Sequence, residues 1–323
     1  MGYEVALKSI EFQNLNILLS VITVNYNGLA DTCSLIDTIA FNSQLEVIVV
    51  DNGSAVNEAQ VIAQRYPQVK TIRSEINLGF AGGNNLGINA ASGRYLYLVN
   101  NDTEFKDSET DNPGTDTEKR TMPVHFQALI DRLESSLQIA VVCPKIRFAW
   151  DACPIQFAGY TPLSAVTLRN HSIGYGEADQ GQYDTPRPTP YAHGAAMMLR
   201  REAVERVGLM PECYFLYYEE LDWSLMFTRA GYQLWYEPAS TIFHKESRST
   251  GVDSPLKTYY IIRNRLLFAR RNESGLRRWA AYGYLTLVVA PRDLLRHLLS
   301  RRSDLAKATL RGIAHFWQGR FNK

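Results

Sequence analysis

The chain has 323 residues, of which 46% are hydrophobic and 21% charged, as in an ordinary globular protein with room for one large domain and an appendage. Its net charge of +1 conceals an asymmetry, because residues 1–256 carry −11 and residues 257–323 carry +12. No apolar run reaches the roughly 20 residues that span a bilayer, and the four cysteines lack zinc-type spacing, so neither a membrane-spanning protein nor a zinc-site protein is expected.

The N-terminus and the cysteines bear on the cellular compartment. Residues 1–16 lack the basic-then-apolar pattern of a signal peptide. Four scattered thiols suit a reducing environment, and they are Cys33, Cys143, Cys153 and Cys213. We therefore expect a cytoplasmic protein, with peripheral contact at the inner face of the plasma membrane through its basic C-terminal region.

The first hundred residues alternate apolar strands with helices. Strands are expected at 16–24, 45–51, 69–73 and 94–100, and Ser54 is the expected N-cap of the helix after the second strand. Continuous β-branched runs separated by helices predict an α/β fold with a parallel sheet covered on both faces. Ligands bind such sheets at the carboxyl ends of the strands. The polar residues at these ends are Asn25, Asp51, Asn52, Asn77, Asn100, Asn101 and Asp102.

The segment 77–102, NLGFAGGNNLGINAASGRYLYLVNND, is rich in glycine and asparagine. Its glycines permit close backbone approach, and the helix N-terminus beside them offers unpaired N–H groups to an anion. These glycines are Gly79, Gly82, Gly83 and Gly87, and their spacing is not the GxGxxG dinucleotide fingerprint. We expect the segment to hold phosphates, and the alternative is that the glycines only serve turns and packing.

The segment ends in Asn100, Asn101 and Asp102. Asp102 is a candidate ligand for a hard divalent cation, with the amide oxygens of the two asparagines as weak partners. The alternative is an aspartate that caps a turn. His244, which we expect after a later pair of strands, is either a structural residue or an imidazole ligand beside Asp102.

The middle of the chain is less regular. Residues 106–123 are almost entirely polar and predict a solvated loop or a disordered insertion. A helix at 124–137 and a strand at 139–148 follow, then irregular or hairpin structure at 150–190, then a strand and a helix at 195–208.

An aromatic run, YFLYY at 214–218, delivers Glu219, Glu220 and Asp222 to the start of a helix that ends near Gly231. The helix dipole favours negative charge at an N-terminus, so capping is one interpretation of these carboxylates. Bulky aromatic neighbours would desolvate a carboxylate and raise its basicity, which favours a general base.

The C-terminal region reads as three helices, at 254–272, 276–300 and 303–318. Apolar stretches such as YLTLVVA and DLLRHLL alternate there with arginines. Basic amphipathic helices often lie in a membrane interface. The alternative is a helical cap or an oligomer contact, with arginines on the solvent-exposed face.

Together these segments resemble the family 2 glycosyltransferases, in the branch that includes bacterial rhamnosyltransferases. The motifs, in chain order, are VITVNYNG, VIVVDNGS, NLGFAGGNNLGI, LVNND, HGAAMMLRREAVERVG, YYEELDWSLMFTRAGY and the later His244, and they cover about residues 17–271. The resemblance implies a GT-A fold over residues 1–254, with a nucleotide-binding half at about 17–105 and an acceptor half at about 124–254. Residues 255–323 form the basic helical extension.

The resemblance also implies roles for residues at matching positions. Thr23, Asn25 and Asp51 would line the base and ribose pocket, and Asn77, Gly79, Gly83 and Asn84 would lie against ribose and diphosphate. Further substrate contacts are expected from Asn52, Asn101, Glu219 and Trp223. Asn100 and Asp102 occupy the DxD position, and His244 occupies the position of the third metal ligand.

The catalytic base of the family falls on Glu220, with Asp222 as the second candidate. Two departures from the family pattern matter. Asn100 replaces the first acid of DxD, so the Mg²⁺ or Mn²⁺ cofactor would depend on Asp102, His244 and the donor phosphates. Glu220 replaces the usual aspartate and is about one methylene longer.

The expected activity is inverting transfer of a sugar, with rhamnose as a guess, from a nucleoside diphosphate donor to a glycan or lipid-linked acceptor in cell-surface polysaccharide synthesis. Two alternatives stay open: a catalytically degenerate sugar-nucleotide or polysaccharide-binding protein, and a nucleotidyltransferase. The latter would need a basic glycine-rich loop after the first strand, and VNYNGLADT has no basic residue. No nucleic-acid partner is expected, because no base-reading motif is present.

Overall fold

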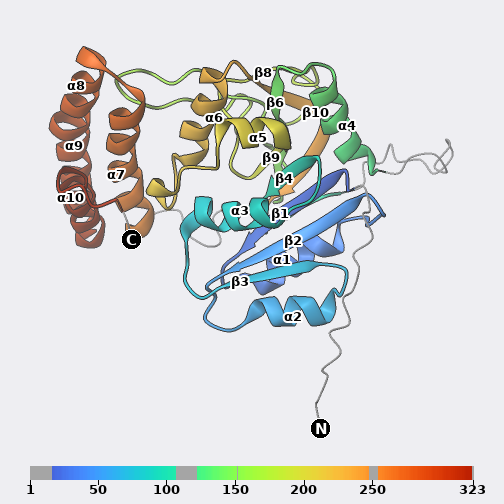
Figure 1. Cartoon of the computed structure of the whole chain (residues 1–323). Coiled ribbons are helices and arrows are strands. Elements are labelled where there is room, and N and C mark those ends of the chain that lie inside the picture. The colour runs from blue at the N-terminus through green and yellow to red at the C-terminus, as the bar shows by residue number, and fades with distance from the viewer. Residues whose placement is uncertain (1–16, 107–121, 151, 247–253, 322–323) are drawn as a thin grey trace, which may run out of the picture.

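The computed structural model describes residues 17–106, 122–150, 152–246 and 254–321. A single sheet with strand order β3-β2-β1-β4-β9-β6-β10-β5 forms the centre, and helices cover its faces (Figure 1). The strands are β1 Leu19–Asn25, β2 Leu45–Asn52, β3 Lys70–Ser74, β4 Tyr95–Val99, β5 Thr103–Glu104, β6 Ile139–Phe148, β7 Ile155–Phe157, β8 Arg187–Pro188, β9 Ala196–Arg200 and β10 Gln233–His244. The polar loop predicted at 106–123 lies almost wholly outside the described residues.

The helices follow the strands in alternation along the first half and are grouped at the C-terminal end. They are α1 Leu29–Asp37, α2 Glu58–Arg65, α3 Gly79–Ala90, α4 Val124–Glu134, α5 Arg201–Val207, η2 Glu212–Tyr214, α6 Glu219–Arg229, α7 Pro255–Asn272, α8 Gly275–Gly283, η3 Tyr284–Val289, α9 Ala290–Leu299 and α10 Ser303–Trp317. No helix in the described part of the chain is both long enough and apolar enough to cross a membrane.

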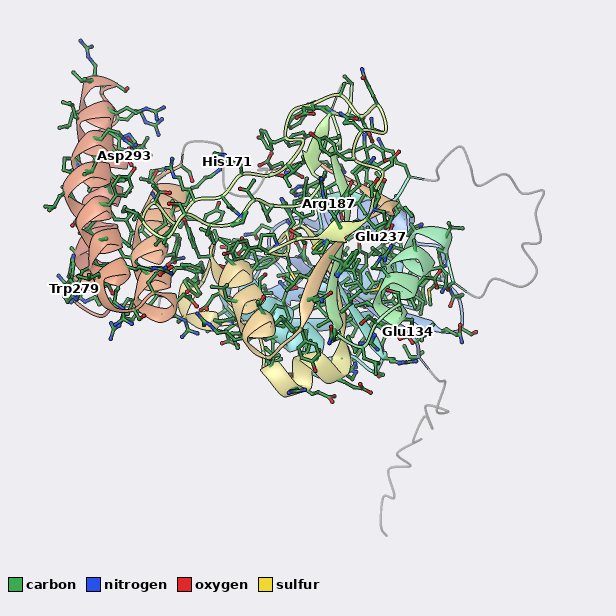
Figure 2. The ribbon with its side chains drawn as sticks, turned by 90° about the horizontal axis from the view of Figure 1, so that it is seen from above. Glu134, His171, Arg187, Glu237, Trp279 and Asp293 are labelled. Atoms are coloured by element: carbon green, nitrogen blue, oxygen red, sulfur yellow. The ribbon has the colours of Figure 1, made fainter. Side chains whose placement is uncertain are left out.

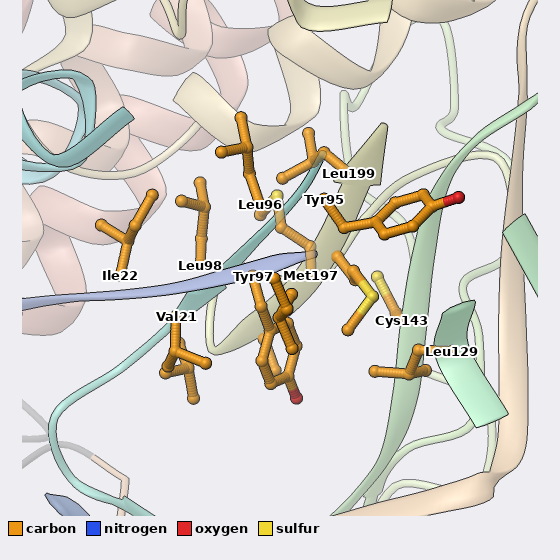
Figure 3. Close-up of a cluster of buried hydrophobic side chains, with 14 of the residues drawn as sticks. Val21, Ile22, Tyr95, Leu96, Tyr97, Leu98, Leu129, Cys143, Met197 and Leu199 are labelled. Atoms are coloured by element: carbon orange, nitrogen blue, oxygen red, sulfur yellow. The ribbon is translucent and has the colours of Figure 1, made fainter. Parts of the chain in front are cut away.

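The first half of the sheet is parallel. β1 pairs in parallel with β2 and β4, and β2 pairs in parallel with β3. Figure 3 shows Ile22, Leu96 and Leu98 on one side of these strands and Val21 and Tyr97 on the other. All five are buried, which explains the continuous apolar runs of the sequence. The prediction of an α/β fold with a mostly parallel sheet is confirmed.

The predicted cap of α2 is wrong. The N-cap is Asn57, whose side chain accepts a hydrogen bond from the Gln60 N–H, because α2 begins at Glu58. Ser54 lies before the helix, and its hydroxyl accepts the N–H of Asn27 at 2.9 Å. Ser54 therefore ties the loop after β2 to the loop after β1.

The second half of the sheet differs from the prediction at β10. We expected a pair of strands before His244, but β10 is one long strand that pairs in parallel with β6 and ends at His244. Its register shifts between Glu237 and Thr241, so residues 238–240 bulge out of the ladder. β9 is antiparallel to both β4 and β6.

The C-terminal helices lie beside the sheet domain, at the left of Figure 1. They enclose a second hydrophobic core, which contains Leu266 and Phe268 of α7. This core also contains Leu168, Tyr214 and Leu221 from the first part of the chain. The amino-acid composition therefore changes at residue 254, but the second hydrophobic core contains residues from both sides of this position.

Candidate active site

The ends of β1 and β2 form a network of buried polar side chains. Asn25 donates to Glu58 Oε2 at 2.7 Å and accepts the Thr32 hydroxyl at 2.8 Å. The Asp51 carboxylate accepts the Glu58 N–H at 3.1 Å and pairs with Arg73 at 2.8 Å. These side chains hold the loops after the two strands in place and form the floor of the predicted nucleotide site.

Thr23 lies in the interior of β1, and its hydroxyl is fully buried. This hydroxyl has no hydrogen-bond partner among the described residues. A buried hydroxyl without a partner costs free energy, and the structure brings no other predicted site residue into hydrogen-bond contact with the Thr23 hydroxyl among the described residues.

The turn before α3 is fixed by Asn52. Its amide donates to Asn77 Oδ1 at 3.2 Å and to the Gly79 carbonyl at 3.0 Å, and its oxygen accepts the Leu78 N–H at 2.9 Å. Gly79 has φ +79°, and a Cβ there would overlap the carbonyl of Phe215. Only glycine fits this position, so the loop between β3 and α3 has a single defined shape.

Within α3, Gly83 and Asn84 serve packing. A Cβ at Gly83 would lie 2.8 Å from Val24 Cγ1 and 3.1 Å from the Asn52 amide nitrogen. The Asn84 amide donates to the Phe80 carbonyl at 2.9 Å. At these two positions the structure favours the packing alternative, while Asn52, Asn77 and Gly79 shape the loop itself.

Asp102 and His244 lie side by side, with His244 Nε2 3.1 Å from Asp102 Oδ1. Asn100 lies beside them, its amide nitrogen 3.5 Å from the same Nε2. His244 Nδ1 is 2.8 Å from Gln156 Oε1, so Nδ1 donates and Nε2 is the atom directed at Asp102. Asn101 lies apart from this pair, because its amide donates to the Thr32 hydroxyl at 3.0 Å.

This donor set fits a divalent cation that shares its coordination with a substrate. It offers one carboxylate, one imidazole nitrogen and the amide of Asn100, with the imidazole oriented by Gln156. No group of three or more acidic, histidine or cysteine side chains able to hold a metal occurs among the described residues. A cation here would therefore need oxygens from a bound diphosphate.

Two carboxylates begin α6. Glu219 is 2% exposed, and one of its oxygens has no hydrogen-bond partner among the described residues. Burial and the neighbouring charge of Glu220 raise the pKa of Glu219 well above its usual range. Glu220 is half-buried, and burial raises its pKa to about 7. A carboxylate with this pKa is suited to take a proton near neutral pH.

The other two predicted residues of α6 lie in the interior. Asp222 is 1% exposed, pairs with Arg271 at 2.5 Å and accepts the Tyr214 hydroxyl at 3.0 Å. Trp223 is buried and donates its indole N–H to the Gly208 carbonyl at 2.9 Å. Asp222 thus holds α7 against α6, and neither side chain is brought to the same place as Glu220.

A three-residue strip, His193 to Ala195, lies between the acidic and the metal-type residues. The Asn100 N–H donates to the Ala195 carbonyl at 2.9 Å. A Cβ on Gly194 would lie 3.9 Å from Glu220 Cγ. The strip thus contacts the predicted DxD position through Ala195 and lies next to the predicted base at Gly194.

His193 was not singled out from the sequence. Burial, then the nearby His244, lowers its pKa to about 3, so the imidazole is neutral. Its Nδ1 accepts the Ala195 N–H at 3.1 Å, which leaves the proton on Nε2. The ring stacks on Tyr160 at 5.8 Å, and the charge of Glu220 contributes, after burial, to the raised pKa of Tyr160. Its position in the HGAA motif is the signal that sequence reasoning overlooked.

The loop that leads to Glu219 is strained. Phe215, Tyr217 and Tyr218 have φ of 67°, 71° and 80°, which bulky residues adopt at a cost. Asn264 of α7 stabilises this loop, because its buried amide donates to the carbonyls of Tyr214 at 3.0 Å, Leu216 at 2.7 Å and Tyr217 at 2.8 Å. The polar Arg-Asn-Arg within the apolar run YYIIRNRLLF was the sequence signal for this role.

The glycine-shaped loop, the carboxylate–imidazole pair and the glutamate with a raised pKa make up the candidate site, and comparisons with known proteins show what the chain is similar to. Residues 20–110 match the family model described as "Glycosyl transferase family 2". The chain is 25% identical over 307 residues, 94% of its length and 92% of the relative's, to the "Low-salt glycan biosynthesis hexosyltransferase Agl10" of Haloferax volcanii. It is 24% identical, over 77% of its length and 84% of the relative's, to an "N-acetylglucosaminyl-diphospho-decaprenol L-rhamnosyltransferase" of Mycobacterium tuberculosis.

Solved structures share the fold. A mannosyltransferase from Pyrobaculum calidifontis, in complex with GDP-Man and Mn²⁺, superposes with a TM-score of 0.55 at 14% identity, over 94% of this chain and 87% of that one. GalNAc-T7 with UDP, GalNAc and Mn²⁺ superposes with a TM-score of 0.56 at 15% identity, over 80% of this chain and 52% of that one. The chain therefore has a GT-A fold, and its residues 20–110 match the model of the glycosyltransferase family that its motifs resemble.

Proposed function

We propose that this protein is an inverting glycosyltransferase that moves a hexose from a nucleoside diphosphate to a hydroxyl of a glycan or lipid-linked acceptor. The observation that carries the proposal is the strip from His193 to Ala195. It joins Asn100, beside Asp102 and His244, to Glu220, whose pKa of about 7 suits a general base. In this proposal the proton acceptor and the site for the diphosphate charge therefore lie near each other.

In the proposed reaction Glu220 accepts the proton of the acceptor hydroxyl. The hydroxyl oxygen forms a bond to the anomeric carbon of the donor while the bond from that carbon to the diphosphate oxygen breaks. The nucleoside diphosphate leaves with the electron pair of the broken bond. One base and no covalent intermediate on the enzyme give inversion, by the same logic that relates base and ring face in inverting glycosidases.

The diphosphate would lie against the loop that Asn52, Asn77 and Gly79 shape. A bound Mn²⁺ or Mg²⁺, held by Asp102 and His244, would supply positive charge beside the departing diphosphate. Neutral His193, with its proton on Nε2, is placed to donate a hydrogen bond to a substrate oxygen between these groups.

The proposed donor is a nucleoside diphosphate hexose, with rhamnose as first choice. Support comes from the relatives, which include an archaeal hexosyltransferase of glycan biosynthesis and a mycobacterial rhamnosyltransferase whose name specifies an N-acetylglucosaminyl-diphospho-decaprenol acceptor. A lipid-linked acceptor requires access to a membrane surface.

We also propose that α8, η3 and α9 contact an anionic membrane surface. Several of their large apolar side chains face solvent, among them Leu276 at 88%, Trp279 at 65%, Leu287 at 77%, Leu295 at 60% and Leu299 at 77% exposed. Figure 2 shows Trp279 and Asp293 on the helical layer, on the opposite side of the molecule from Glu134. Exposed leucines beside arginines complement both the apolar and the anionic parts of a lipid interface.

The decisive experiment combines donor binding with one substitution. A panel of nucleoside diphosphate sugars, each with and without Mn²⁺, is screened for thermal stabilisation of the full chain. Glu220→Gln should bind the donor that stabilises the wild type but lose transfer by about 10³-fold. Glu202→Gln, an exposed matched control, should retain activity. Full transfer by the Glu220→Gln enzyme would reject the assigned base, and a donor hit without any transfer by the wild type would favour a binding protein.

A further inference from the structure

A groove of about 1100 Å³ lies between the first half of α7 and α10. Its lining combines two tyrosines, Tyr259 and Tyr260, with three cations, Lys307, Arg311 and Arg320. Nothing in the proposed chemistry of the donor uses these residues. They lie in the part of the chain whose net charge is +12.

The cations of the groove lack an acidic partner within the part of the chain that the structure describes. No ion pair of Lys307, Arg311 or Arg320 occurs among the described residues, whereas Asp304, the acid in the lining, is bound by Arg302 through two contacts of 3.0 and 2.9 Å. Cations that converge without counter-charge attract a multiply charged anion, and guanidinium groups match phosphate oxygens in geometry.

The groove is also organised by its aromatic residues. The Tyr259 hydroxyl is 2.9 Å from His315 Nδ1, and the Arg311 guanidinium lies 5.9 Å from the Tyr259 ring centroid. Burial, followed by the charges of Arg311 and Arg320, lowers the pKa of His315. Tyr259 therefore contacts both an imidazole and a guanidinium of the groove.

Apolar side chains complete the lining of the groove. Leu256 is 47% exposed, and Phe321 and Ala308 complete the apolar part. A free phosphate or a soluble anion would leave these groups in water. A ligand with a charged head and an apolar tail would satisfy both parts of the groove.

The groove adjoins the site through α7. Tyr260 stacks on Phe215, with centroids 5.1 Å apart and rings inclined by 20°. The Phe215 carbonyl in turn accepts the Phe80 N–H at 2.7 Å, at the start of α3. The same helix α7 carries Asn264, which holds the loop before Glu219. A ligand in the groove would thus contact the helix that also holds the loop before Glu219.

We propose that the groove between α7 and α10 binds the diphosphate of a polyprenyl-type lipid that carries the acceptor, with the lipid chain along the apolar side of the lining. This inference rests on the proposed function. In this proposal Lys307, Arg311 and Arg320 bind the diphosphate of the acceptor, and the acceptor hydroxyl extends to Glu220.

The binding test uses farnesyl diphosphate, inorganic pyrophosphate and farnesol as probes, titrated into the full chain by calorimetry in EDTA so that a metal-dependent donor site does not respond. Farnesyl diphosphate should bind more tightly than pyrophosphate, and farnesol should not bind. Lys307→Gln/Arg311→Gln should weaken farnesyl diphosphate binding at least tenfold, because charge-assisted phosphate contacts are lost. Arg277→Gln/Arg296→Gln, which removes two exposed charges outside the groove, should change it less than twofold.

A second readout places the ligand. Binding of farnesyl diphosphate should raise the pKa of His315, followed by NMR of its imidazole, because the phosphate charge offsets Arg311 and Arg320. Equal affinities for pyrophosphate and farnesyl diphosphate, equal losses in both double variants, or an unchanged His315 would overturn the proposal. Loss of binding to phosphatidylglycerol vesicles in Lys307→Gln/Arg311→Gln, without any loss for farnesyl diphosphate, would assign the groove to membrane headgroups instead.

The groove proposal and the proposed function can be rejected independently of each other. If the groove acts as inferred, Lys307→Gln/Arg311→Gln should keep its stabilisation by the sugar nucleotide and Mn²⁺, and its KM for a lipid-diphosphate acceptor should rise with kcat little changed. A panel in which no sugar nucleotide stabilises the chain would reject the glycosyltransferase, whereas the calorimetry would still report on the groove.

Discussion

His244 Nε2 lies 3.1 Å from Asp102 Oδ1, although the two residues come from β10 and from the loop after β4. With Nδ1 directed at Gln156 Oε1, a neutral imidazole presents a lone pair to a carboxylate oxygen. Two acceptors at this distance are stabilised by a proton on Nε2 or by a cation that both contact. The pair is therefore a specific place to test for a metal.

Asn100→Asp should strengthen metal binding. Asn100 lies beside the pair, and a carboxylate there would add a negative charge to the donor set. We expect about tenfold tighter Mn²⁺ binding, measured by titration of the Mn²⁺ paramagnetic resonance signal. Asn101→Asp is the matched control, because the Asn101 amide contacts Thr32. Equal gains in both variants would mean that Mn²⁺ responds only to net charge.

The activity should depend on pH through Glu220. Its pKa is raised to about 7 by burial, and a general base works in its deprotonated form. We expect kcat/KM to fall tenfold for each pH unit below about 6.5 and to level off above about 7.5. A profile that stays flat from pH 5 to 8 would contradict the assignment.

The same pKa shift affects stability in the opposite direction. The folded chain keeps the Glu220 proton up to about pH 7, whereas a glutamate in an unfolded chain releases it near 4.5. This contribution to stability is present below pH 4.5 and is lost as the pH rises through 7. The Tm of Glu220→Gln relative to wild type should therefore increase between pH 5 and 8, as thermal denaturation followed by circular dichroism would show.

Arg271→Met should destabilise the protein more than the double variant Asp222→Asn/Arg271→Met. Removing the arginine leaves the Asp222 carboxylate, 1% exposed, without its partner, at a cost of about 3 kcal/mol. The double variant removes the buried charge as well. Urea denaturation measures both, and Arg270→Met serves as the control on the neighbouring residue. Identical losses in the single and double variants would show that the pair contributes only packing.

Leu295→Ser/Leu299→Ser should weaken binding to vesicles that contain phosphatidylglycerol by tenfold or more, because two leucines no longer enter the lipid. Both residues are exposed, so the fold should be unaffected. Leu137→Ser, on a side chain 76% exposed, is the control and should bind as the wild type does. If the double variant instead converts a dimer to a monomer in sedimentation, the face is an interface between copies of the chain.

The strands of the first half could be predicted because their pattern is local. Residues 47–50 are apolar without alternation, and β2 is buried on both faces. The bulge at 238–240 could not be predicted, since it depends on the register that β10 adopts against β6. Ser54 was mistaken for a cap because it is a good capping residue, yet Asn57 lies closer to the start of α2.

The candidate site was partly accessible from motifs. Asp102, His244 and Glu220 stood out through residue type and through the family resemblance. His193 and Asn264 did not, because their importance comes from contacts between distant segments: the tautomer of His193 and the three carbonyls that Asn264 holds are properties of the fold. Asp222 was the second candidate along the chain, and its burial and its contacts with Arg271 and Tyr214 separate it from Glu220.

The contacts of Asn264 have a practical consequence for protein engineering. A truncated protein that stopped at residue 254 would lack the amide that keeps Phe215 to Tyr218 in their unfavourable backbone angles, so it would not yield a minimal catalytic unit. Chimaeras that exchange the terminal helices between homologous enzymes should carry residues 214–218 along with them, because Asn264 and the carbonyls of this loop bind one another.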